Sequence, residues 1–120
     1  MVPESTETRV QEAVLEFTLG NYPDALEKLD AVINDDPGCF EAHLAKTEVL
    51  YAMENYEGAL DAARAAEEIR ADDVHLKTSL SRIWMRLGDK EKAEAYGAEA
   101  KMLSWKHEIL SGEDSDAAAR

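Results

Sequence analysis

The sequence is poor in residues that break helices: its 120 residues include only six glycines and three prolines. Alanine, glutamate, leucine and lysine, which favour helices, are abundant. The hydrophobic fraction of 45% is sufficient for a core. No run of about 18 apolar residues occurs, so we expect no membrane span. Together these features predict a helical protein with one ordinary core.

Cysteine is almost absent as well. The single cysteine, Cys39, cannot form an internal disulfide, which fits a reducing compartment. Nothing near it in the sequence would acidify its thiol, so we expect it to pack and not to act as a nucleophile. Residues 1–7 contain no basic region followed by an apolar one, and therefore predict no signal peptide. We expect a cytoplasmic location.

Positive charge is scarce, with 13 Lys and Arg against 26 Asp and Glu. Residues 1–73 hold 18 acidic and 5 basic residues, whereas residues 74–107 hold 4 and 7. Nucleic acids and anionic membranes need clustered basic residues, so we expect no nucleic-acid partner, and membrane contact stays open only through Trp105 and its neighbours. The opposite charges of the two segments also allow head-to-tail self-association.

Three related stretches begin at Gly20, Glu54 and Gly88, so they recur every 34 residues. A period in this range is typical of stacked supersecondary units. Apolar residues at helical spacing precede and follow each stretch, and the connections are short enough to make each helix pair antiparallel. The predicted helices span about residues 6–19, 23–35, 40–53, 56–70 and 74–87, and from 90 to at least 103.

We expect an N-terminal extension over residues 1–5 and a three-repeat domain over residues 6–110. The predicted repeats cover about residues 6–39, 40–73 and 74–110. Residues 111–120 contain no apolar anchor and are predicted to form a disordered acidic tail.

Over roughly residues 6–105 the chain resembles tetratricopeptide-repeat proteins. The resemblance rests on a small second-helix residue, Ala25, Ala59 or Ala93, and on a turn tyrosine, Tyr22 or Tyr56. It implies an all-α fold, an α-solenoid of three stacked antiparallel helix pairs in a right-handed superhelix. The first helices fit less closely, and the apolar face of the first repeat fits only if its turn is one residue shorter.

The resemblance also implies that the first helix of each pair lines a concave groove for a peptide, a helix or a protein surface. The predicted binding residues are Leu15, Leu44, Glu48, Tyr51, His75, Thr78, Arg82, Met85 and Arg86. Thr8, Gln11, Thr18 and Glu41 face the same way. Arg82 and Arg86 can clamp a carboxylate-bearing segment, or they can pair with Glu48 or with solvent.

A possible second interface comprises Trp105, Ile109 and Leu110. Repeat arrays usually end with an extra polar-faced helix, and the sequence leaves no room for a full one. Either the last helix continues to about Leu110 and covers its own repeat, or these three residues stay exposed for a partner.

The sequence offers no catalytic constellation. It has no glycine-rich phosphate loop, nucleophile elbow or HExxH motif. His43, His75 and His107 are evenly separated, but they occupy different repeat positions and lack further ligands at metal spacing. We therefore expect no enzymatic activity, catalytic residue, metal or cofactor.

The predicted function is that of a non-enzymatic adaptor or scaffold with a protein partner. One alternative is an assembly or secretion chaperone that masks apolar segments of a client. Another is a cytoskeleton-associated adaptor similar to bacterial kinesin-light-chain-like proteins. The family's clamp for the acidic C-termini of heat-shock chaperones is disfavoured, because Glu41 and Glu48 would repel such a ligand.

Overall fold

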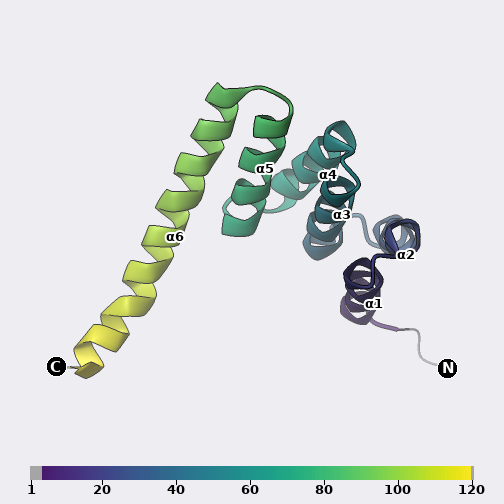
Figure 1. Cartoon of the computed structure of the whole chain (residues 1–120). Coiled ribbons are helices and arrows are strands. Elements are labelled where there is room, and N and C mark those ends of the chain that lie inside the picture. The colour runs from purple at the N-terminus through teal and green to yellow at the C-terminus, as the bar shows by residue number, and fades with distance from the viewer. Residues whose placement is uncertain (1–3, 120) are drawn as a thin grey trace. The chain divides into compact units, whose positions relative to one another are not determined.

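A computed structural model describes the backbone of residues 4–119 and the side chains of residues 4–111. The described backbone contains six α-helices and no strand, so the predicted all-α class is confirmed. The helices are α1 (Thr6–Thr18), α2 (Tyr22–Asp35), α3 (Phe40–Ala52), α4 (Tyr56–Ile69), α5 (Val74–Arg86) and α6 (Lys90–Ala119) (Figure 1).

The chain forms two compact units, Met1–Ala71 and Asp72–Arg120. In the first unit α1 packs against α2, α3 packs against α4, and α3 also contacts both α1 and α2. In the second unit α5 packs against α6. Each pair is joined by a three-residue connection, which makes its helices antiparallel as predicted.

The first helix starts where its sequence predicts. Ser5 is the N-cap, and its hydroxyl accepts a hydrogen bond from the Thr8 amide at 3.1 Å. This bond satisfies one of the amides that a helix start leaves unpaired. Asp73 caps α5 in the same way, accepting from the Leu76 amide at 2.9 Å.

The three connections within the pairs have one geometry. The amides of Asn21, Asn55 and Asp89 donate to carbonyls five residues earlier, at 2.8, 2.9 and 2.9 Å. The residue before each of them has a positive φ, 84° at Gly20, 63° at Glu54 and 87° at Gly88. Glycine adopts this left-handed conformation freely, whereas Glu54 must hold its Cβ in it.

The expectation of a shorter turn in the first repeat is therefore wrong. With equal connections, Val14 takes the place that Glu48 and Arg82 hold in the later repeats. Leu15 corresponds instead to Val49 and Ile83, which are buried, although Leu15 itself is 57% exposed. Helical spacing alone missed this shift, because Val14 and Leu15 are both apolar.

Small residues bring the paired helices together. Ala25, Ala59 and Ala93 are fully or almost fully buried, as their repeat position predicts. In the second unit, Gly97 leaves room for Ser81: a Cβ on this glycine would lie 3.2 Å from the serine Oγ. The Ser81 hydroxyl donates to the Ala93 carbonyl at 2.7 Å, which satisfies it inside the contact.

The predicted tail falls mainly on residues 112–120, whose side chains lie outside the described part, while α6 as a helix continues to Ala119. Residues 1–3 of the predicted N-terminal extension also lie outside it. The domain bounds therefore stay predictions. None of the helices in the described part combines the length and hydropathy that crossing a bilayer requires.

Candidate protein-binding surface

On α3, the predicted binding residues Leu44, Glu48 and Tyr51 follow one another at spacings of four and three, so they share a face of the helix. All three are half-buried, which leaves part of each side chain accessible. The Tyr51 ring packs edge-on against Tyr56, with 5.3 Å between ring centroids. These three residues therefore form one partly open strip of the first unit.

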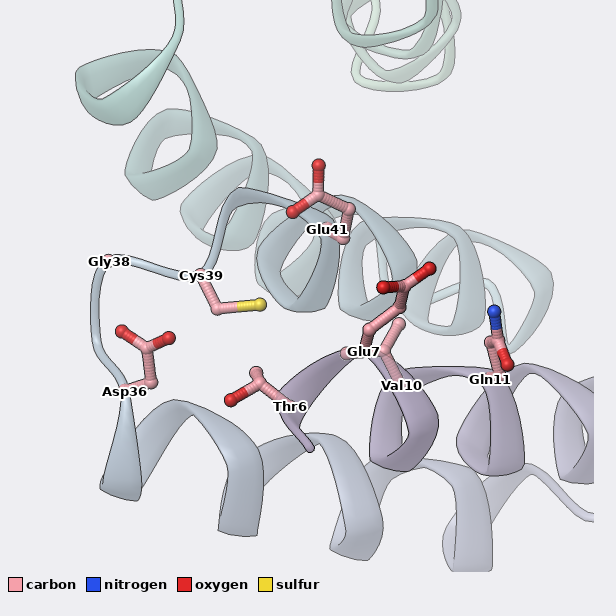
Figure 2. Close-up of a pocket in the computed structure, with 8 residues that line it drawn as sticks. All are labelled: Thr6, Glu7, Val10, Gln11, Asp36, Gly38, Cys39 and Glu41. Carbon is pink, nitrogen blue, oxygen red and sulfur yellow. The ribbon is translucent and has the colours of Figure 1, made fainter. Parts of the chain in front are cut away.

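A cavity of about 670 Å³ opens in the first unit beside the starts of α1 and α3 (Figure 2). It is lined by Thr6, Glu7, Val10, Gln11, Asp36, Gly38, Cys39 and Glu41. Gln11 and Glu41 are among the positions expected to face the groove. No pattern in the sequence indicated that Asp36 and Cys39, from the connection between α2 and α3, would join them.

The polar lining of this cavity is dominated by carboxylates. Glu7 comes from α1, Asp36 from the connection after α2 and Glu41 from α3 (Figure 2), and all three are exposed. Among the ion pairs that the described side chains form, one involves a carboxylate of this cavity. In it, Oε2 of Glu41 lies 3.5 Å from Nη1 of Arg70. Arg70 also lies over the Phe40 ring, 4.3 Å from its centroid. The cavity consequently favours a cationic group.

Acidic crowding continues along α1. A hydrogen bond with Glu12, together with repulsion between the two carboxylates, raises the pKa of Glu4 above its usual 4.5. The Arg9 and Lys28 charges act in the opposite direction. The raised pKa therefore reflects the close approach of the Glu4 and Glu12 carboxyl groups.

In the second unit, the predicted residues His75, Thr78, Arg82, Met85 and Arg86 all lie on α5 and all are exposed. The first four follow at spacings of three, four and three, so they form a strip along the helix. Arg82 and Arg86 are one helical turn apart at its C-terminal end. The strip pairs an apolar side chain, Met85, with two guanidinium groups.

The second candidate interface is open to solvent. Trp105 is 59% exposed, Ile109 40% and Leu110 62%, so of the two alternatives the structure shows the exposed one. These residues border a shallow apolar depression of about 290 Å³ on α6, together with Met102, Leu103 and Lys106.

His43 and Cys39 belong to the packing of the first unit. His43 is buried, and its Nε2 lies 2.8 Å from the Pro37 carbonyl. Cys39 is a half-buried free thiol. Among the described residues no group of three or more His, Cys, Asp or Glu side chains could hold a metal ion.

The helix pairs with their small contact residues define a class of helical-repeat protein. The model of the tetratricopeptide repeat matches residues 10–74, which span most of the first unit, and the chain belongs to this family. The predicted family is thus confirmed. No protein of curated function matches the chain in sequence.

Solved structures with this fold include MamA from AMB-1 and the type III secretion translocator chaperone SycD of Yersinia enterocolitica. MamA is 16% identical to this chain with a TM-score of 0.77, and the match covers 87% of this chain and 62% of the MamA chain. The chain thus spans less than two thirds of MamA. One SycD structure, an alternative dimer, is 15% identical with a TM-score of 0.83, covering 98% and 89%. Another, in complex with a peptide of the translocator YopD, is 18% identical with a TM-score of 0.80, covering 96% and 90%.

Proposed function

We propose that the chain is a cytoplasmic, non-enzymatic adaptor or scaffold that binds a segment of another protein on its first helices. The observation that carries the proposal is the cavity beside α1 and α3, where three carboxylates from separate elements surround one space. The partly exposed strips on α3 and α5 support it, since each mixes apolar and charged side chains. Such a mixture is typical of peptide recognition.

The first unit is suited to a basic segment that also carries apolar residues. The cavity lies within the range of about 300–1,000 Å³ that small-ligand pockets occupy, so it has room for one or two side chains. Glu7, Asp36 and Glu41 attract a lysine or an arginine, while Val10 supplies an apolar wall. The excess of negative charge in residues 1–73 would accelerate the encounter.

This selectivity is tested by panning a random peptide library against the wild type and measuring the affinity of the selected peptides for variants. Glu7→Lys/Glu41→Lys should weaken them by about tenfold or more, because two of the three cavity charges are reversed. Glu27→Lys/Glu68→Lys is the matched control: it changes the net charge equally at exposed positions of α2 and α4. Equal losses in both variants, or no loss in the first, would show that the cavity does not select the ligand.

For the second unit we propose that Arg82 and Arg86 hold carboxylates of the partner. Arginine at a spacing of four can present two guanidinium forks to one acidic segment. The test is a pull-down from the source cell with wild type and an Arg82→Glu/Arg86→Glu variant in parallel. Recovery of the same partner in equal amount would refute this assignment.

A second candidate function is that of a chaperone for an apolar client segment. It is favoured by the likeness of nearly the whole chain to SycD, a chaperone solved with a peptide of its translocator. Under this proposal a client is soluble when it is co-expressed with the chain and aggregates when it is expressed alone. A partner that is stable by itself would leave the adaptor function standing and eliminate the chaperone.

A further inference from the structure

Helix α6 has two apolar faces, and α5 covers only one of them. Ala93 and Ala100 are buried on the covered face, with Tyr96 and Gly97 half-buried between them. The opposite face carries a row of exposed apolar side chains, which we call the α6 seam. The seam comprises Ala95, Ala98, Met102, Trp105 and Ile109.

The seam has the spacing of a coiled coil. Its five residues follow at alternating intervals of three and four, which is the heptad pattern of positions a and d. Met102 and Trp105, at its centre, are 63% and 59% exposed. An exposed apolar row of this kind marks an interface.

The length of α6 leaves the seam accessible. The helix has 30 residues and its partner α5 has 13. Its C-terminal part therefore runs on past the beginning of α5, as Figure 1 shows. From Ala95 to Ile109 the seam extends about 21 Å, at about 1.5 Å per residue.

We propose that the seam is covered by the α6 of a second copy of this chain, in an antiparallel coiled coil with two-fold symmetry. In the register that we infer, Met102 faces Trp105 of the other copy and Ala98 faces its Ile109. At both ends of the coiled coil, the small Ala98 side chain then packs against the larger Ile109. At its centre the two largest side chains, Met102 and Trp105, pack against each other. One surface thus complements itself, as a two-fold interface requires.

The charges beside the seam select this register. Lys101 and Glu108 flank one side of it and Glu99 and Lys106 the other, and all four are exposed. In the antiparallel register Lys101 faces Glu108 of the other copy, and Glu99 faces its Lys106, so every pair is attractive. Because of the symmetry each pair forms twice.

A parallel arrangement brings like charges together. In a parallel coiled coil, a residue that flanks one side of the seam faces the residue five positions later in the other copy, which flanks the opposite side. Glu94 would then face Glu99, and Lys101 would face Lys106. Both contacts are repulsive, so the sequence opposes the parallel dimer and supports the antiparallel one. Glu99 also lies 3.7 Å from Lys77 Nζ within its own unit, so Lys101 and Glu108 are the better residues to change.

Sedimentation equilibrium of the full chain at about 0.15 M salt tests the proposal, because salt at this level screens the net charge beyond about 8 Å. The seam has only about two heptads, so we expect a dimer with a Kd of about 1–100 μM. Trp105→Glu should weaken it by about a hundredfold or more. Leu19→Glu, at an exposed apolar residue of the first unit, should leave it unchanged. A wild type that is monomeric at about 500 μM overturns the proposal, even if it binds lipid vesicles or another protein.

Charge exchange then tests the orientation. Lys101→Glu alone and Glu108→Lys alone should each weaken the dimer by about tenfold, since each makes two attractive pairs repulsive. The double variant Lys101→Glu/Glu108→Lys should restore the wild-type Kd, as should an equal mixture of the two single variants. A dimer that Lys101→Glu strengthens would be parallel, because that change removes the repulsion from Lys106, and it would refute the register.

Disulfide trapping provides an independent readout of the same geometry. On a Cys39→Ser background, Ala98→Cys mixed with Ile109→Cys should give a disulfide-linked heterodimer, because these positions face each other in the antiparallel register. Homodimers linked through residue 98 would indicate a parallel pair and contradict it. Helical content measured by circular dichroism confirms that each variant has folded.

Discussion

Replacing Glu54 by glycine should stabilise the first unit, because Glu54 holds a backbone conformation that glycine adopts without strain. Its φ is 63°, and the equivalent Gly20 and Gly88 have φ values of 84° and 87°. The Glu54 amide donates to the Tyr51 carbonyl at 2.9 Å, just as the two glycines donate at their helix ends. The turn itself therefore requires the left-handed conformation, whichever residue occupies it.

The expected gain is the difference between two terms. A residue with a Cβ loses about 1–2 kcal/mol in the left-handed region. Glycine offsets this gain by about 0.5–1 kcal/mol, because it loses more backbone entropy on folding than other residues do. The free energy of unfolding should rise by about 0.5–1 kcal/mol, which corresponds to a Tm increase of about 2–4 °C for a protein of this size.

Urea denaturation followed by circular dichroism measures the change, with Glu54→Ala as the control. Alanine removes the same charge but keeps the Cβ, so it should give little of the gain. Gly20→Ala and Gly88→Ala should destabilise by about 1 kcal/mol each, because they introduce the strain that Glu54 already carries. If Glu54→Gly is no more stable than Glu54→Ala, backbone strain is not the cause and the reasoning fails.

Three further changes probe the packing, a helix cap and a carboxyl pair. Ala59→Leu should destabilise by about 1–3 kcal/mol in urea denaturation, because this alanine is fully buried where α3 and α4 meet; an unchanged midpoint would contradict the close contact. Asp73→Ala should cost about 1 kcal/mol through loss of the α5 cap, whereas Asp72→Ala, next to it and exposed, should cost little. Glu12→Gln should lower the pKa of Glu4 toward 4.5, as carbon-13 NMR of the carboxyl groups would show; a pKa that stays raised would mean that Glu12 is not its cause. Since folding raises this pKa, the stability that Glu4 contributes is present below pH 4.5 and is lost as the pH rises through the raised value.

The helices and turns could be predicted because their causes are local. Ser5 and Asp73 cap helices whose starts lie within a turn of them in the sequence, and Gly20 and Gly88 end helices by their own backbone freedom. The buried alanines recur at the repeat spacing, because each helix pair meets in the same way. These features gave the fold class and most helix bounds.

The candidate site was less predictable, because it joins residues by packing and not by period. Glu7 and Glu41 are repeat equivalents, but Asp36 reaches the same cavity from a connection between helices. The one-residue misplacement of Leu15 had a similar origin. Its apolar neighbour Val14 fits the same helical pattern, so only the hydrogen bonds of the turn show which residue takes which position.

The sequence by itself determined the helical class, the 34-residue repeat and the acidic character of residues 1–73, since these follow from composition and local spacing. It also contained the heptad of α6, although Ala95 and Ala98 look like ordinary helix formers in isolation. Only the tertiary structure decided which face of α6 is buried against α5. Because α5 covers Ala93 and Ala100, the opposite row from Ala95 to Ile109 stays exposed, and an exposed apolar row needs a partner.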